Sequence, residues 1–281
     1  MPEFLTLQEA AERLGVHYMT AYRYVRLGQL AARKERGTWR VAPSDLELFQ
    51  QGDGNASSDV VSRKHVAWSQ RFENRLLDGD ASGAWKVIER ALTAGTSPLG
   101  IYTEVVVPAL DSIGSRWESG EIGVAEEHQA SFLVTRLIGR LSPHFHRPGR
   151  RKGSVVVAGP PGERHFINLA MAADALRLGG YDPIEVGSDL PVDEFERTLR
   201  RHLPLKGVCL GVMSEETLEA CRNMIFRARG VLPSEVPIVV GGRGIEGHDH
   251  ALRMGADWAA DLESVVEAIE SGRRIVSAVS V

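Results

Sequence analysis

The chain has 281 residues, a net charge of −4 and a hydrophobic fraction of 43%, which is ordinary for globular proteins and sufficient for two or three domains. Its two cysteines, Cys209 and Cys221, do not make a disulfide framework, and we recognise neither a signal segment nor an apolar run of membrane-spanning length. We therefore expect a modular protein of the reducing cytoplasm.

The start of the chain has a helix-turn-helix pattern. Apolar residues at helical spacing predict a helix over Leu7–Leu14, Gly15 and Val16 form the turn, and a second helix follows over Tyr18–Leu27. Between positions 13 and 40, seven arginines or lysines accompany one acidic residue, Glu35. This excess of positive charge favours a DNA-binding surface, because each neutralised phosphate releases counterions. The alternative is a helical protein-interaction domain with a solvated basic face.

This segment resembles the winged DNA-binding domains of the excisionase and MerR type, through LTLQEAAERLGVHYMTAYRYVRLGQL and the following RKERGTWRV. In that family the second helix enters the major groove and the wing lies along the DNA backbone. The resemblance implies DNA-binding residues on the recognition helix, which are His17, Tyr18, Thr20, Arg23 and Arg26, and on the wing, which are Arg33, Lys34, Arg36 and Arg40. Of these, Arg23 and Arg26 are best suited to bidentate bonding with guanine.

A run of predicted helices follows over residues 65–145, with no strand pattern among them. They cover His65–Leu77, Ala81–Ala94, Pro98–Trp117 and Val124–Leu141, with short connections at Asp80, Gly95 and the ESGEIG turn. Four helices joined by short connections predict a bundle. The stretch QQGDGNASSD before it is rich in Gly, Ser, Asn and Asp, which is typical of a flexible tether.

An indole and a Glu-His pair flank one turn of this bundle, since nine residues separate Trp117 from Glu127 and His128. Each residue also has an ordinary explanation. Trp117 can be an aromatic of the bundle core, Glu127 a favourable acid in the first turn of a helix, and His128 a half-buried polar side chain. The spacing WxxxxxxxxxEH resembles the helical cap of the light-sensing cobalamin repressors of the CarH type. The resemblance implies that Trp117 gives apolar cover and that Glu127 and His128 hydrogen-bond the upper ligand, an adenosyl group. Glu118 stands where that family has a histidine, and a carboxylate is the poorer partner for cobalt.

The last part of the chain alternates strands with helices. The predicted strands are Gly153–Gly159, Pro183–Val186, Gly207–Val212, Pro237–Val240 and Ala256–Ala259, and the predicted helices are Phe166–Leu178, Val192–His202, Glu215–Arg229 and Leu262–Ser271. Crossovers of this length require parallel pairing, so we expect a flavodoxin-like strand order. The pattern alone also allows a generic Rossmann-like domain that binds no cobalamin.

The loop after the first of these strands carries a lone histidine in the sequence GERHFIN. Ligands bind at the carboxyl ends of the strands in open α/β sheets, and His165 follows such an end. Glu163 is close enough in sequence to hydrogen-bond one ring nitrogen of His165, which leaves the other nitrogen for a metal. The alternative is a solvated surface histidine.

The pattern ExHxxN at 163–168 resembles the DxHxxG and ExHxxG loops of cobalamin-binding domains, in which the histidine is the lower cobalt ligand. Those domains also carry SxL after the third strand and GG after the fourth. Here 42 residues separate Asn168 from the sequence GVM at 211–213, and 27 residues separate GVM from GG at 241–242. The resemblance implies a cobalamin site with His165 as cobalt ligand and with further cofactor-binding residues, which are Glu163, Asn168, Gly211, Met213, Gly241 and Gly242. We expect the glycine pair to let the backbone approach a bulky ligand, and Gly211 to leave room where the family has serine.

These elements give a multidomain organisation. We expect a MerR-type winged helix-turn-helix domain at 1–50, a linker at 51–63, a four-helix bundle cap at 64–146 and a flavodoxin-like cobalamin-binding domain at 152–281. The resemblances together imply a cytoplasmic transcriptional regulator, a photoreceptor and repressor that binds adenosylcobalamin and binds operator DNA as a dimer or tetramer. A regulator of the same build whose pocket binds another ligand or none is the alternative. A cobalamin enzyme is disfavoured, because no segment remains for a separate substrate domain.

Overall fold

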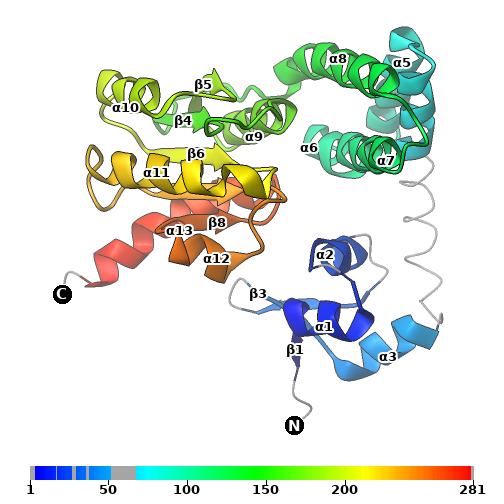
Figure 1. The fold of residues 1–281 in the computed structure, drawn as a ribbon, viewed down its shortest axis with the longest axis horizontal. Coiled ribbons are helices and arrows are strands. Elements are labelled where there is room, and N and C mark those ends of the chain that lie inside the picture. Colours follow the sequence, from blue (N-terminus) through cyan, green and yellow to red (C-terminus); the bar gives the residue numbers. More distant parts are fainter. Residues whose placement is uncertain (1–3, 17, 27–29, 36–37, 52–67, 280–281) are drawn as a thin grey trace. The chain divides into compact units, whose positions relative to one another are not determined.

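The computed structural model describes residues 4–16, 18–26, 30–35, 38–51 and 68–279 of the chain. The chain divides into two compact units, Met1–Arg71 and Phe72–Val281 (Figure 1). Over the described residues, no helix is both long enough and apolar enough to cross a membrane.

The first unit combines a small antiparallel sheet with helices. Its strands pair in the order β1-β3-β2, and the register places Arg33 opposite Arg40 in the β2–β3 hairpin. The strands are β1 (Leu5–Thr6), β2 (Arg33–Glu35) and β3 (Thr38–Val41), and the helices are α1 (Leu7–Leu14), α2 (Tyr18–Arg26) and α3 (Pro43–Gln51). The predicted helix-turn-helix is therefore present, and Leu27, the last residue of its second predicted helix, lies outside the described residues.

Helix α1 has local sequence signals at both ends. The Thr6 hydroxyl accepts a hydrogen bond from the backbone N–H of Glu9, and the Glu9 carboxylate accepts one from the backbone N–H of Thr6, which is a capping box. At the other end Gly15 has φ +66°, a left-handed conformation that glycine adopts without a Cβ clash. These caps fix the turn that leads into α2.

The predicted four-helix bundle, which we call the cap, follows along the chain, and its first helix crosses the boundary between the two units at Phe72. Its helices are a segment over 68–77, α5 (Ala81–Thr93), the stretch Pro98–Glu118 and α8 (Val124–Leu141). The third helix was predicted as one element, and the structure divides it into α6 (Pro98–Gly100), a π-helical turn η1 (Ile101–Val106) and α7 (Val107–Glu118). Pro108 has no N–H for the regular ladder, and Val107 N–H bonds to the Tyr102 carbonyl five residues back.

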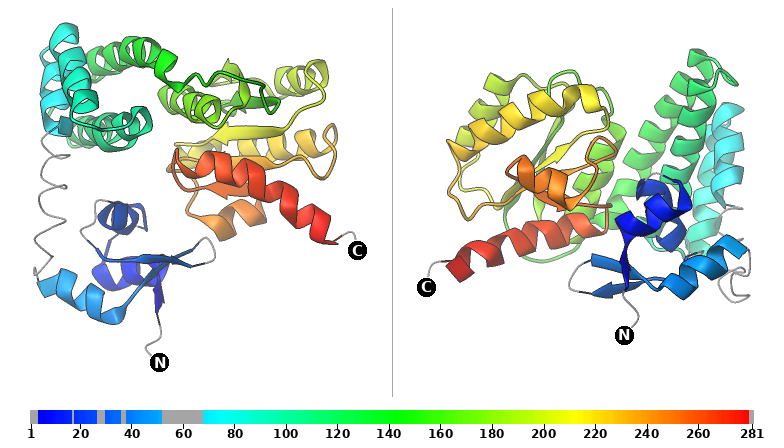
Figure 2. Two further views of the ribbon diagram at one scale, coloured as in Figure 1. Left: turned by 180° about the vertical axis from the view of Figure 1, so that it is seen from behind. Right: turned by 60° about the horizontal axis from the view of Figure 1, so that its bottom comes forward.

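The cap leads into a five-stranded parallel sheet with the order β5-β4-β6-β7-β8, so the predicted flavodoxin-like order is confirmed. Figure 2 shows this sheet and the helices that cover it from two further sides. The strands are β4 (Ser154–Ala158), β5 (Asp182–Gly187), β6 (Gly207–Gly211), β7 (Ile238–Gly241) and β8 (Asp257–Ala259). The helices are α9 (Ile167–Leu178), α10 (Val192–Arg201), α11 (Leu218–Arg229), α12 (His248–Arg253) and α13 (Ser264–Val279).

Both faces of this sheet are covered, as the continuous apolar strands require. Val155 and Val157 face one core, shared with α9 and α13, whereas Val156 and Ala158 face the other, shared with α10, α11 and α12. The short helix α12 was not predicted. The last helix begins two residues later than predicted, because the Asp261 carboxylate accepts a hydrogen bond from the Ser264 backbone N–H at 2.7 Å.

Candidate functional site

The site is built at the carboxyl edge of the sheet, where the loops after parallel strands meet. The loop between β4 and α9 carries Glu163 and His165, the loop after β6 carries Met213, and the loop after β7 carries Gly242. The direct pairing of β4 with β6 and of β6 with β7 places these loops side by side. The structure thus brings together three chain segments that are far apart in sequence.

The carboxylate of Glu163 accepts hydrogen bonds from two of these loops. Glu163 is 1% exposed, and its Oε1 accepts a hydrogen bond from His165 Nδ1 at 2.5 Å and another from the His165 backbone N–H at 3.1 Å. Its Oε2 accepts from the backbone N–H groups of Met213 at 2.7 Å and Ser214 at 3.2 Å, and from Thr217 Oγ1 at 3.3 Å. The acid therefore joins the histidine loop to the loop after β6.

These hydrogen bonds shift the pKa of Glu163 and the pKa of His165. Burial raises the pKa of Glu163, but the hydrogen bonds from His165, Met213 and Ser214 outweigh it and lower that pKa to about 2. The hydrogen bond to Glu163 raises the pKa of His165, against burial and the charge of Arg243, which lower it. The carboxylate holds Nδ1, so Nε2 is the ring nitrogen that can bind a metal, and the 59% exposed side chain leaves the ring accessible.

The cap contributes a second acid to this region. Glu127, in the first turn of α8, acts on His165 through its charge, which raises the pKa of the histidine. The Glu127 carboxylate also accepts hydrogen bonds from His128 Nδ1 at 2.6 Å and from Ser131 Oγ at 2.7 Å. His128 is exposed, and Trp117, near the end of α7, is 47% exposed. The charge of Glu127 therefore reaches His165, and the exposed His128 is its neighbour in sequence.

The three predicted glycines are packed closely against protein atoms. A Cβ at Gly242, where φ is +108°, would overlap the carbonyl oxygen of Val212, and a Cβ at Gly241 would lie 2.9 Å from the Ala259 carbonyl oxygen. A Cβ at Gly211 would lie 2.5 Å from Leu169 Cδ2. The expectation of free room was wrong at Gly211, where the Leu169 side chain takes up the space. At Gly241 and Gly242 a Cβ would clash with backbone atoms, so the close packing of the strand ends requires glycine there.

Sequence reasoning missed part of the hydrogen-bond network around Glu163. Thr217 is 4% exposed and donates to Glu163, and Ser214 takes part through its backbone, as Met213 does. The sequence signal was the presence of two hydroxyl residues, Ser214 and Thr217, shortly after a buried strand. Such residues are also typical of the start of a helix, so the signal did not single them out. Because Met213 acts through its N–H, its side chain is not what the network depends on. Asn168, in the first turn of α9, is half-buried.

The structure describes the side chains of only some of the predicted DNA-binding residues. On the recognition helix α2, the ring of Tyr18 stacks with that of Tyr22, with centroids 6.3 Å apart. On the wing, the guanidinium of Arg33 lies 3.6 Å from the centre of the Phe4 ring, and Arg40 is half-buried. His17 and Arg36 lie outside the described residues, as do the side chains of Thr20, Arg23, Arg26 and Lys34.

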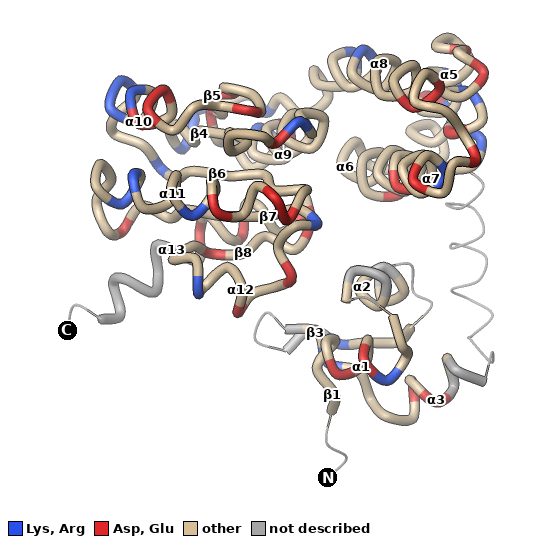
Figure 3. The backbone as a smooth tube through the Cα atoms, in the orientation of Figure 1, with Lys and Arg blue, Asp and Glu red and all other residues tan. Residues whose placement is uncertain are grey.

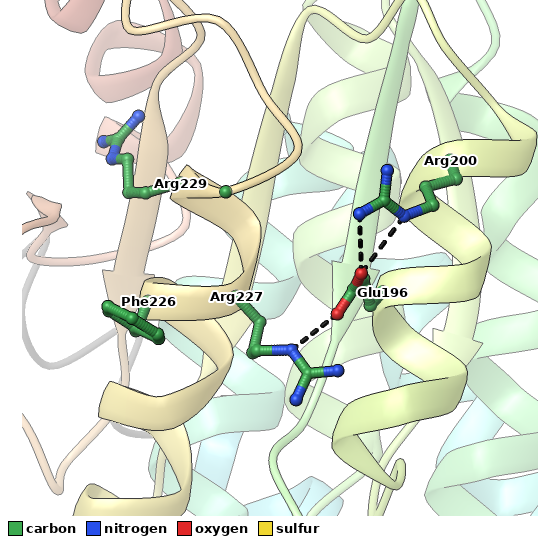
Figure 4. Close-up of a pocket in the computed structure, with 6 residues that line it drawn as sticks. Glu196, Arg200, Phe226, Arg227 and Arg229 are labelled. Atoms are coloured by element: carbon green, nitrogen blue, oxygen red, sulfur yellow. Dashed lines mark hydrogen bonds and ion pairs between the residues drawn. The ribbon is translucent and has the colours of Figure 1, made fainter.

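A pocket of about 400 Å³ lies elsewhere, along α10 and α11 (Figure 4). Its acid, Glu196, accepts hydrogen bonds from Arg200 at 2.8 Å and from Arg227 at 2.5 Å. Figure 3 shows the basic and acidic residues interspersed along α10. The charged side chains pair with one another, which accounts for their positions without a ligand.

Known families and proteins match both units of the chain. The family model described as "Helix-turn-helix domain" matches residues 4–53, and the one described as "B12 binding domain" matches residues 68–142. The HTH-type transcriptional repressor CarH of Myxococcus xanthus is 31% identical over 223 residues, which are 76% of this chain and 72% of that protein. Trimethylamine corrinoid protein 1 of Methanosarcina acetivorans is 22% identical, over 71% of this chain and 95% of that protein.

A solved structure shares the fold of the second unit. The monomethylamine corrinoid protein of Methanosarcina barkeri superposes with a TM-score of 0.63 at 16% identity, over 75% of this chain and 99% of that one. Fold, site and matches together define a cobalamin-binding helix-turn-helix transcriptional regulator. The chain belongs to the CarH family of HTH-type transcriptional repressors.

Proposed function

We propose that this chain is a light-responsive repressor that binds adenosylcobalamin between its cap and the carboxyl edge of its sheet, with His165 as the lower cobalt ligand. The observation that carries the proposal is the exposed imidazole of His165, held through Nδ1 by the buried Glu163 carboxylate. A corrin needs one such protein ligand on its lower face, since the macrocycle supplies the nitrogens around the metal. A carboxylate on the other ring nitrogen strengthens imidazole as a ligand.

The upper face of the cofactor would meet the cap. Glu127 and His165 each shift the pKa of the other through their charges, which supports a site that both residues border. In the proposal Trp117 covers the adenosyl group, and Glu127 and His128 exchange their mutual hydrogen bond for bonds to it. The remaining cofactor contacts come from the loops after the strands, at Asn168, Gly211, Met213, Gly241 and Gly242.

The winged unit would bind operator DNA through α2 and the β2–β3 hairpin, as a MerR-type domain. We propose that the cofactor-bound chain assembles in the dark into a dimer or tetramer, because linked weak modules gain affinity through avidity. Light would break the cobalt–carbon bond and reverse assembly. In this proposal the chain is a regulator and not a catalyst, and it works on DNA in the cytoplasm.

The test is gel filtration of the full chain with adenosylcobalamin in the dark and after green light, with absorbance recorded across the elution. We expect corrin absorbance to co-elute with the protein, in a larger species that binds DNA tightly in the dark. His165→Ala should change the corrin spectrum, whereas His248→Ala, at an exposed histidine of α12, should not. Absence of bound corrin would refute cobalamin binding and favour a different ligand or none. A bound corrin without a light-dependent change in size would refute the light switch.

A further inference from the structure

The loop that carries His165, residues 159–166, ends in a firmly fixed helix. It leads directly into α9, whose Asp174 is 1% exposed. The Asp174 carboxylate accepts hydrogen bonds of 2.7 Å from Tyr102 Oη of the cap, from Ser142 Oγ directly after α8, and from Arg177 Nη1 of α9. We call these four residues the Asp174 cluster. Because this carboxylate is buried and both of its oxygens accept hydrogen bonds, the cluster fixes α9 and with it the far end of the loop.

The near end of the loop follows β4, and a pair of prolines limits how it can be held there. Gly159 exchanges two backbone hydrogen bonds, of 2.9 Å and 3.2 Å, with the end of β5 and the loop after it. Pro160 and Pro161 have no N–H to donate. The N–H of Gly162 is therefore the next backbone donor on the way to His165.

Asp189, in the loop after β5, accepts a hydrogen bond from this donor, and its Oδ1 lies 2.7 Å from the Gly162 nitrogen. Asp189 has φ +53°, and in the part of the chain that the structure describes it is the one residue other than glycine with a positive φ. A residue with a Cβ is strained in this region, although aspartate tolerates it better than most. Asp189 is also exposed, so it adds no apolar contact to the core. A strained residue that does not serve the core points to a role in function.

Two neighbouring residues, Gly162 and Glu163, are thus held from opposite sides. Strand β4 lies between β5 and β6 in the sheet. Asp189 reaches Gly162 from the side of β5, whereas the loop after β6 donates to the Glu163 carboxylate. Glu163 in turn accepts hydrogen bonds from the ring and from the backbone N–H of His165. The hold on Gly162 therefore bears on the backbone from which both the acid and the histidine project.

We propose that Asp189 is a positioning residue for the cobalt ligand, which by holding Gly162 keeps the imidazole of His165 in place before the cofactor arrives. Glu163 sets the orientation of the ring, whereas Asp189 sets the path of the backbone that carries it. A ligand that is already in place loses less freedom on binding, so the preformed loop tightens cofactor binding. This inference rests on the proposed function, since it assumes that cobalt binds at His165.

Amide exchange in the ligand-free full chain, measured by nuclear magnetic resonance, tests the hold on the loop without a cofactor. Asp189→Gly removes the acceptor and relieves the strained φ, so exchange of the Gly162 amide should become about tenfold faster. Asp189→Asn keeps an oxygen acceptor and tolerates the left-handed conformation, so exchange should stay within about twofold of the unchanged chain. The control Asp182→Ala removes an exposed carboxylate at the other end of β5 and should change nothing. Unchanged exchange of Gly162 in Asp189→Gly would overturn the proposal.

Cofactor binding tests whether this hold acts through His165, with the Kd of adenosylcobalamin measured in the dark by equilibrium dialysis. Asp189→Gly should raise Kd about tenfold and Asp189→Asn less than about twofold, because groups that support a metal ligand contribute such factors. In a His165→Ala background Asp189→Gly should have no further effect, whereas damage to the fold would weaken both backgrounds alike. Equal weakening in the two backgrounds would contradict a positioning role.

Failure of the proposed function gives a different result. If the unchanged chain binds no adenosylcobalamin, or if His165→Ala binds it as tightly, the proposed function is refuted. If His165→Ala weakens binding and Asp189→Gly does not, the role of Asp189 alone is refuted.

Discussion

Replacing Tyr102 by phenylalanine tests whether the buried Asp174 cluster holds the cap on the sheet domain. Burial and the Asp174 carboxylate raise the pKa of Tyr102 well above its usual value, so its hydroxyl is a permanent donor. Phenylalanine keeps the stacking on Phe145 and removes only this hydroxyl, whose oxygen lies 2.7 Å from Asp174 Oδ2. A hydrogen bond to a charged group contributes about 1.5–3 kcal/mol, so we expect a loss of about 2 kcal/mol.

The assay is urea unfolding of the full chain at pH 7, followed by circular dichroism and tryptophan fluorescence. With a urea dependence of about 2 kcal/mol per M, the midpoint of the second unit should fall by about 1 M. Ser142→Ala removes another donor to the same carboxylate, so the two changes together should not be additive.

The matched control is Thr135→Val, which removes a hydroxyl bonded to the Ser131 carbonyl of its own helix. We expect this control to change stability by less than about 0.5 kcal/mol, because the carbonyl keeps its place in the helical ladder. If Tyr102→Phe changes the midpoint no more than Thr135→Val does, the cluster does not hold the cap.

Three further predictions concern other parts of the chain. The pKa of Glu163 is lowered to about 2 from 4.5, so its ionised form stabilises the folded state by roughly 3 kcal/mol above pH 4.5, and this is lost as the pH falls toward 2. The gap in urea midpoint between the ligand-free chain and Glu163→Gln should therefore shrink between pH 7 and pH 3.5, and a constant gap would contradict the assignment. Burial raises the pKa of Cys209 and of Cys221 to about 12, so a disulfide reagent at pH 8 should label the native chain at least 100-fold more slowly than the urea-unfolded chain. Fast native labelling would show that the sheet core is open. In gel-shift titrations Arg23→Ala should cost about 1–3 kcal/mol and relax the preference for one operator base pair, whereas Arg33→Ala should weaken all sequences alike and reduce the salt slope by about 1. An Arg23→Ala loss equal on every sequence would argue against base reading.

Much of the fold was predictable because its signals are local. The alternation of Val155, Val156 and Val157 between two cores comes from a strand period of two residues, and crossovers of ten or more residues require parallel pairing. The helix α8 was predicted with its observed bounds from apolar spacing after the ESGEIG turn. The short helix α12 was missed because six residues hold too little periodicity to stand out.

For the candidate site, the sequence by itself determined the contact that spans two residues, from Glu163 to His165, because neighbours in a short loop meet wherever the loop is placed. Only the tertiary structure decided the other partners, such as Thr217, which is 54 residues from Glu163, and Tyr102, which is 72 residues from Asp174. It also decided that Asp111 meets Arg243 across 132 residues, and that protein atoms fill the space beside the glycines. The physical reason is that residue periodicity fixes which face of an element is buried, whereas the partner of a side chain depends on how those faces pack together.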